Sequence, residues 1–158
     1  MTTEQKKEFT RKISQANASE LIVILYDIAL VYVNESIQYM EKEDYANAKI
    51  QAGFARRSIE EMIANLHFEY DLAVVLHRVY LSMKKSLRES ILENNTEPLY
   101  AVKKNLLSLR DAYAQVVKQD KSAPVMGHAQ TVVAGLTYGK NSLNESLAQE
   151  SSNRGFCV

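Results

Sequence analysis

Histidine is the residue of this sequence best suited to holding a metal, and the chain contains three of them. Di-iron centres in helical bundles need a Glu three residues before a His on each of two helices, so that both side chains reach one metal site. The residues three positions before His67, His77 and His128 are Ala64, Val74 and Val125. This spacing predicts no metal site, and the histidines are interpreted as ordinary surface or boundary residues.

The single cysteine, Cys157, is the only candidate for thiol chemistry. One cysteine excludes an internal disulfide and a thiolate-rich metal site, and such sparing use is typical of a reducing cytosol. The chain ends Gly-Phe-Cys-Val, which places the cysteine second from the end, whereas prenylation requires it fourth from the end. Cys157 is therefore interpreted as an exposed free thiol.

The remaining signatures of catalysis are missing from the sequence. It contains no glycine-rich phosphate loop, no carboxylate pair in a plausible cleft and no nucleophile elbow. The sequence therefore predicts a protein that is not an enzyme and needs no cofactor. Lys plus Arg equals Asp plus Glu, at 19 each, so no whole-molecule field exists to attract nucleic acid or an anionic membrane.

The longest apolar run extends from Leu21 to Val33 and contains Asp27. It is shorter than the roughly 20 residues that a membrane span needs. The basic start of the chain is interrupted by Glu4 and Glu8, which does not fit a signal peptide, so a cytoplasmic protein is expected. A lone carboxylate in such a run must face water, a partner or a cation.

For Asp27 an ion pair that helps to specify the fold is favoured over a direct partner contact. The candidate cations are Arg56, Arg57 and Arg110. Three tyrosines, Tyr26, Tyr80 and Tyr113, fall on three different predicted helices. Tyrosine can pack its ring and keep its hydroxyl wet, so core packing and a partner interface both remain open for them.

Apolar residues recur at spacings of three and four along most of the chain, which is typical of amphipathic helices. Four long helices are predicted: from Asn17 or Ser19 through Met40, from a cap at Asp44 to about Leu66, from about Asp71 to Leu92, and from a cap at Thr96 to about Val116. The second has a seam that begins with alanines, comprising Ala48, Ala52, Ala55, Ile59, Met62 and Leu66. The stripe of the third comprises Leu72, Leu76, Val79, Met83 and Leu87, and that of the fourth comprises Leu99, Val102, Leu106, Leu109, Tyr113 and Val116.

Helices of this length joined by short loops predict an all-α, antiparallel up-down four-helix bundle over residues 17–120. Residues 1–16 are predicted to form an N-terminal arm, because this charged stretch is marginal as an isolated helix. Residues 121–158 are predicted to be a partly ordered C-terminal tail. The tail is too apolar for a solvated linker, since it contains Val132, Val133, Leu136 and Tyr138.

Several stretches together resemble the FliS family of flagellar secretion chaperones. The stretch Ala-Ser-Glu-Leu-Ile-Val-Ile-Leu-Tyr-Asp at residues 18–27 is similar to the opening helix of that family. The similarity continues with Asp-Tyr at 44–45, Ala-Asn-Leu-His-Phe-Glu at 64–69 and Leu-Arg-Asp-Ala-Tyr at 109–113. The chain departs from the family at Ile28, where Gly is usual, and at Tyr113, where Trp is usual. The ordered set of motifs carries the resemblance.

The resemblance implies a cytosolic export chaperone that binds the C-terminal segment of flagellin, prevents its premature polymerisation and helps deliver it to the flagellar export gate. Ile50 and Phe54 form an apolar pair outside the alanine seam, which suggests a partner surface. The predicted flagellin-binding residues are Phe9, Ile13, Leu21, Leu25, Tyr26, Ile50, Phe54, Tyr80 and Tyr113. A second hypothesis is that the tail covers a groove until client displaces it.

An alternative from a different class also remains open. The same apolar faces suit a structural or signalling bundle that forms homo-oligomers and has no client. A chaperone without client is expected to be a monomer or a weak homodimer, whereas a structural oligomer should resist dilution.

Overall fold

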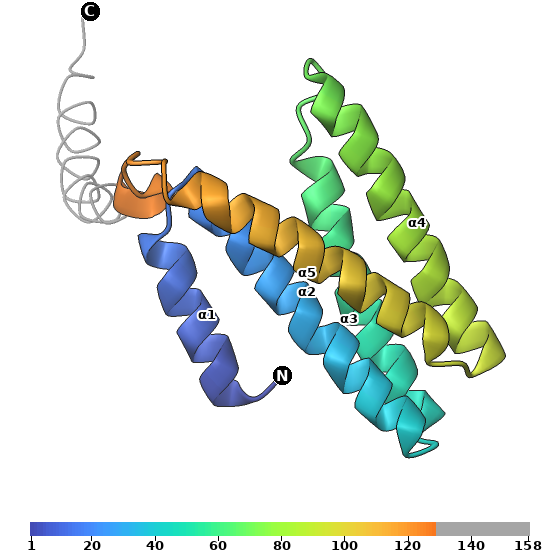
Figure 1. The fold of residues 1–158 in the computed structure, drawn as a ribbon. Coiled ribbons are helices and arrows are strands. Elements are labelled where there is room, and N and C mark those ends of the chain that lie inside the picture. The colour runs from blue at the N-terminus through green and yellow to red at the C-terminus, as the bar shows by residue number, and fades with distance from the viewer. Residues whose placement is uncertain (129–158) are drawn as a thin grey trace, which may run out of the picture.

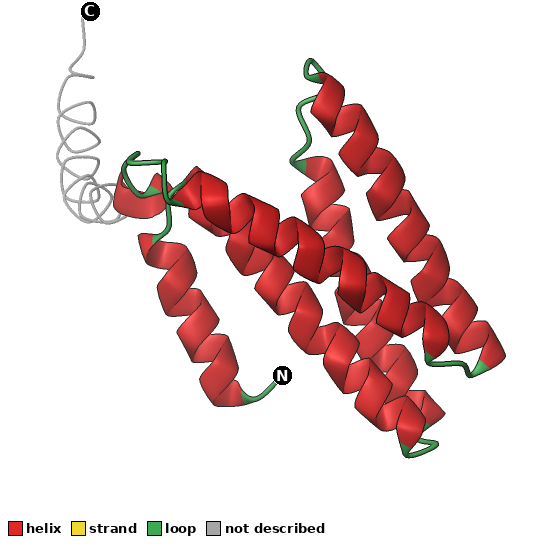
Figure 2. Ribbon diagram, viewed as in Figure 1, coloured by secondary structure: helices red, strands yellow, loops and turns green. Residues whose placement is uncertain are grey.

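The computed structural model describes residues 1–128, and every regular element in this range is a helix, with no strand (Figures 1 and 2). The elements are α1 (Thr3–Gln15), α2 (Ala18–Glu41), α3 (Tyr45–Ala64), α4 (Asp71–Glu93), α5 (Glu97–Val117) and the short 3-10 helix η1 (Val125–His128). The predicted all-helical class is confirmed. The four long predicted helices are α2 to α5, and α1 is a fifth helix where an arm was predicted.

Short polar caps start α2 and α3 at positions that the sequence predicted. Asn17 accepts a hydrogen bond from the Glu20 backbone N–H at 2.9 Å, and the Glu20 carboxylate accepts one from the Asn17 N–H at 2.9 Å, which forms a capping box for α2. The Asp44 carboxylate accepts from the Asn47 N–H at 3.1 Å and begins α3. These bonds satisfy N–H groups that have no partner inside the helix.

The cap of α5 differs from the prediction. Thr96 occupies the N-cap position, but its side chain makes no capping hydrogen bond. Instead, the Asn95 side-chain oxygen accepts from the Glu97 N–H at 2.9 Å. Asn94 adopts the left-handed conformation with φ 49°, which Asn tolerates better than most residues. The Asn94–Asn95 pair therefore forms the turn between α4 and α5 and also supplies the cap.

The alanine seam of α3 lets its backbone approach α2 closely. Ala48, Ala52 and Ala55 are almost completely buried, and the Ser36 hydroxyl of α2 donates a 2.8 Å hydrogen bond to the Ala48 carbonyl. A side chain as short as serine reaches a neighbouring helix backbone only at short interaxial distance. The seam therefore sets the α2–α3 packing.

The core lies between α2, α3, α4 and α5, which contact one another in that order, with α5 returning to α2. The largest fully buried side chains come from all four helices: Tyr26, Ile59, Met83, Leu99, Leu106, Val33 and Val102. Figure 1 shows the chain reversing direction between successive long helices. Burial of these side chains is the main favourable contribution to folding.

Two predicted stripe positions lie outside this core. Leu72, at the start of α4, is 61% exposed, and Val116, at the end of α5, is 49% exposed. Both belong to apolar stripes predicted from the spacing, and the structure places both at the surface. They occupy terminal turns of their helices, where the apolar periodicity continues although the buried part of the stripe does not include them.

The predicted arm is a helix because its ends are held. At its start, the Thr2 hydroxyl accepts from the Gln5 N–H at 3.2 Å in a capping box. At its end, the Val125 N–H donates a 3.0 Å hydrogen bond to the Ala16 carbonyl, and η1 lies beside α1 (Figure 1). The sequence suggested a marginal isolated helix, whereas these contacts from distant residues stabilise it.

The division into an arm, a bundle and a tail stays a prediction. The predicted tail-docking residues Val132, Val133, Leu136 and Tyr138, together with Cys157, lie outside the described residues. No helix within residues 1–128 combines the length and apolar character that a bilayer crossing requires.

Candidate partner-binding surface

An exposed apolar patch lies where α2 and α3 meet. Ile50 is 53% exposed and Phe54, one turn later on α3, is 37% exposed. The Phe54 ring packs against the Tyr32 ring of α2, with centroids 5.1 Å apart. We call Tyr32, Ile50 and Phe54 the Phe54 patch. The Arg57 guanidinium lies 5.9 Å from the Phe54 ring centroid, which places a cation beside the patch.

The Phe54 patch confirms that the Ile50–Phe54 pair lies outside the core. Tyr32 is not among the residues predicted for a partner surface. It lies seven residues after Leu25, which places both on one face of α2, and this spacing is the signal that could have found it. Aromatic residues that are half-buried at the surface are common in protein interfaces.

The start of α1 reaches the same region. The Met1 amino group forms an ion pair with Glu35 of α2, and the Tyr32 hydroxyl lies 3.9 Å from the Met1 sulfur. The predicted arm residues Phe9 and Ile13 are half-buried. Their spacing of four residues places them on one side of α1, and α1 contacts α2 and η1.

Three further predicted residues lie within the protein or at its boundary. Tyr26 of α2 and Tyr80 of α4 are 0% and 2% exposed, and their hydroxyls hydrogen-bond to each other. Tyr113 of α5 is half-buried, with its ring centroid 5.7 Å from that of Tyr26. Tyr26 and Tyr80 therefore pack in the core, which is one of the two interpretations left open from the sequence.

Burial moves the pKa of these tyrosines further above physiological pH. Removal from water raises the pKa of the Tyr26 hydroxyl well above its usual range, and the hydrogen bond with Tyr80 adds to this effect. Burial raises the pKa of the Tyr80 and Tyr113 hydroxyls as well. The three hydroxyls are neutral at physiological pH, so they offer hydrogen bonds and no charge.

The ion pair expected for Asp27 is present. Arg110 Nε of α5 donates a 2.6 Å hydrogen bond to Asp27 Oδ1 of α2. Asp27 also lines a crevice of about 370 Å³ between the end of α1, α2 and the end of α5, together with Lys12, Glu20 and Val117. The predicted residues Leu21 and Leu25 are half-buried on α2.

A second apolar patch surrounds the connection between α3 and α4. Phe68, Tyr70, Leu72 and Val75 are between 55% and 64% exposed. The Phe68 ring lies edge-on to the His77 ring, with centroids 5.3 Å apart. We call these four apolar residues the turn patch. Sequence reasoning missed it because Leu72 and Val75 lie in a helix that also supplies the core residues Leu76, Met83 and Leu87.

The site holds no arrangement suited to metal chemistry in the part of the chain that the structure describes. No three His, Cys, Asp or Glu side chains gather there in a group that could bind an ion. His67 is exposed and His77 is half-buried, and His77 packs against Phe68. What the surface offers is exposed apolar area on helices, which suits binding of another helix.

Comparison with protein families gives one match. A family model described as FliS, flagellar protein FliS, matches residues 1–120. The match covers α1 to α5, including the helix that the sequence predicted as an arm, and it ends before η1. No individual curated protein matches the chain.

Proposed function

Because the chain belongs to the FliS family of flagellar export chaperones, we propose that it binds the C-terminal segment of flagellin in the cytoplasm. Binding prevents premature polymerisation and assists delivery of flagellin to the export gate. In this proposal the acting unit is the antiparallel up-down bundle of α2 to α5, with α1 lying on it. The family membership carries the role, and the exposed apolar surface on α3 supports the mode of binding.

The Phe54 patch is the observation that favours a helical client. Ile50 and Phe54 are exposed on a helix whose opposite side is fully committed to the core. An amphipathic client helix that lays its apolar stripe along α3 would remove both side chains from water. Binding of this kind needs no chemistry, so the client can later be released without a covalent step.

The predicted residues take different places in this proposal. Ile50 and Phe54 provide exposed contact area, and the half-buried Leu21, Leu25 and Tyr113 lie at the boundary. Tyr26 and Tyr80 are buried, so in this proposal they do not contact the client and affect binding only by holding the core that supports the binding surface. Phe9 and Ile13 act through α1, which lies against α2.

Calorimetric titration with the C-terminal segment of flagellin from the same organism tests the proposal. We expect stoichiometric binding with a large negative heat-capacity change, because the client buries apolar area as it becomes ordered. Ile50→Glu and Phe54→Glu should each weaken binding at least about tenfold, since a carboxylate at a desolvated contact costs several times the thermal energy. Absence of heat and of co-elution would remove the proposed role and leave the fold unchanged.

Leu107→Glu on α5 is the matched control, since Leu107 and Phe54 are both 37% exposed. This variant adds the same charge at a similar exposure and should keep wild-type affinity. Equal losses for Leu107→Glu and Phe54→Glu would show that charge alone matters, which contradicts a client surface at the Phe54 patch.

The Phe54 patch also suits weak pairing of two copies of the chain. Two such patches related by a twofold axis present identical apolar surfaces to each other. Light scattering over a hundredfold dilution separates this case from a permanent oligomer, because a weak dimer dissociates. Phe54→Glu should abolish the dimer if the patch forms it.

A further inference from the structure

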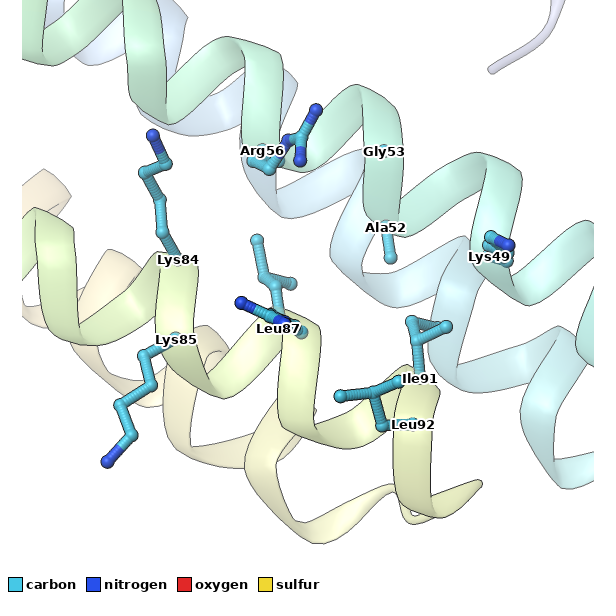
Figure 3. A pocket seen from close by; sticks show the side chains of 10 residues that line it. Lys49, Ala52, Gly53, Arg56, Lys84, Lys85, Leu87, Ile91 and Leu92 are labelled. Carbon is cyan, nitrogen blue, oxygen red and sulfur yellow. The ribbon is translucent and has the colours of Figure 1, made fainter.

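A groove of about 600 Å³ runs between α3 and α4 (Figure 3). None of its lining residues belongs to the Phe54 patch. Its floor is apolar and is formed by Ala52 and Gly53 of α3 and by Leu87 and Ile91 of α4. Leu92 stands at its edge and is 70% exposed. Small residues on one wall and larger apolar ones on the other leave an open channel along the two helices.

Cations line both sides of this groove. Lys49 and Arg56 belong to α3, and Lys84, Lys85 and Arg88 belong to α4. No lining residue is acidic. Because the whole chain has equal numbers of acidic and basic residues, this concentration of positive charge is a local feature of one groove.

Nearby carboxylates neutralise only part of the charge. Glu60 accepts from Lys84 at 2.8 Å and lies 3.7 Å from Arg56, and Glu89 lies 3.5 Å from Lys85. Two carboxylates against five cations leave an excess of three positive charges. Within residues 1–128, neither Lys49 nor Arg88 has an ion-pair partner, so both are available to an acidic ligand.

Gly53 is a second, independent observation. It lies in the middle of α3, where glycine destabilises a helix relative to alanine. A Cβ at this position would meet nothing within 4 Å, so no neighbour in the free protein requires a glycine. Because Gly53 has no side chain, the groove stays open beside this position of α3.

We propose that this groove docks an amphipathic helix of a partner protein that carries carboxylates along both edges of an apolar stripe. The stripe would lie over Leu87 and Ile91, and the carboxylates would face Lys49 on one side and Arg88 on the other. A groove between two helices is a common docking place for a third helix. The apolar floor favours this ligand over a polyphosphate or nucleic acid, which would gain nothing from it.

This site goes beyond the proposed flagellin-binding surface. Residues on a helix advance by about 100° each, so Lys49, Gly53 and Arg56 point to a different side of α3 from Ile50 and Phe54. The two surfaces can therefore be tested independently of each other. Neither the groove nor its proposed ligand requires that flagellin be the client.

The first test uses the full chain and two synthetic helical peptides of equal length, each with the same leucine stripe. One peptide carries Glu along both edges of the stripe and the other carries Lys. Fluorescence anisotropy should show binding of the Glu-edged peptide only, with affinity falling at least about fivefold between 50 and 300 mM salt as the charges are screened. Equal binding of both peptides, or of neither, would overturn the proposal.

Variants locate the binding in the groove. The double charge reversal Lys49→Glu with Arg88→Glu should lower the affinity for the Glu-edged peptide at least tenfold. The control variant Lys118→Glu with Lys121→Glu changes two lysines outside the groove and should keep this affinity within about twofold of the wild-type value. Ile50→Glu should retain peptide binding. If Ile50→Glu abolishes it, or if the groove reversal has no effect, the assignment of a separate site is wrong.

Substitutions at Gly53 separate an effect on peptide binding from an effect on the stability of the fold. Gly53→Ala should raise Tm by about 2–4 °C, because Ala favours helix and its Cβ meets nothing within 4 Å. Gly53→Leu should also leave the protein at least as stable as the wild type, because leucine favours helix over glycine. Gly53→Leu should nevertheless lower the affinity for the Glu-edged peptide at least tenfold, because the leucine side chain fills the groove. Unchanged peptide affinity in the Gly53→Leu protein would contradict the proposal. So would binding of inorganic polyphosphate in place of the peptide, which would mark an anion site.

Discussion

Asp27 of α2 and Arg110 of α5 are joined by a 2.6 Å hydrogen bond that spans 83 residues of sequence. The two side chains are 28% and 40% exposed. We expect a double-mutant cycle with Asp27→Asn and Arg110→Gln to give a coupling of about 1 kcal/mol or less, because solvent screens a pair this exposed. The coupling should shrink in 0.5 M salt, measured by urea unfolding. A coupling several times larger would mean that the pair behaves as a buried one.

The Tyr26–Tyr80 hydroxyl pair should behave non-additively. Tyr26→Phe or Tyr80→Phe alone leaves a buried hydroxyl without its partner, which should cost about 1–3 kcal/mol. The double variant removes both polar groups and should cost less than the sum of the two singles. Urea unfolding at pH 7 measures all three. Strict additivity would show that the hydroxyls act independently.

The same pair predicts an alkaline transition. Burial raises the pKa of Tyr26 and of Tyr80 above the ordinary value of about 10. Since the folded pKa exceeds the unfolded one, the contribution to stability is complete below pH 10 and is lost as the pH rises above it. Unfolding monitored between pH 9 and 12 should show a decline that is smaller in the double Phe variant.

The alanine seam should not tolerate larger residues. Ala55 is fully buried against the core, and Ala55→Leu should destabilise the protein by about 1–3 kcal/mol because a packed interior cannot accept three more carbons without strain. Ala46→Leu, at an exposed position of the same helix, should change stability by less than about 0.5 kcal/mol. Denaturant unfolding of the two variants compares them directly. Equal effects would show that α3 is not held closely against α2.

The Asp120 carboxyl should titrate at unusually low pH because of its hydrogen bond with Ser19. The Ser19 hydroxyl donates to the Asp120 carboxylate and lowers its pKa to about 2, with a further contribution from Ser122. Since the folded pKa lies below the unfolded value of 3.8, this stabilisation is present above about pH 4 and is lost as the pH falls towards 2. Ser19→Ala should raise the Asp120 pKa in an NMR titration. An unchanged pKa would mean that Ser122 alone sets it.

Features that depend on residues close in sequence could be predicted well. The Asn17 cap and the alanine seam of α3 both follow local rules, namely the capping preference of short polar side chains and the seven-residue repeat of buried positions. The Asp27–Arg110 pair was one of three alternatives. The sequence predicts a cation near Asp27, but which arginine pairs with it depends on which helices pack against α2.

Features set by tertiary placement could not be predicted. The first turn of α4 keeps the spacing of the buried stripe, so periodicity does not reveal that Leu72 is exposed. In the same way, Lys49 and Arg88 lie on different helices and are 39 residues apart in number. Their shared groove exists only once α3 and α4 are packed together.

The hydrogen bond from the Val125 N–H to the Ala16 carbonyl makes that amide a natural reporter of α1. An amide exchanges its hydrogen with solvent only when its bond is open, so its exchange rate measures the equilibrium between attached and detached α1. A ligand that competes with α1 for the surface of α2 would accelerate this one exchange, whereas a ligand that leaves α1 in place would not. The exchange rate of the Val125 amide therefore shows whether a partner binds at the surface of α2 that α1 covers.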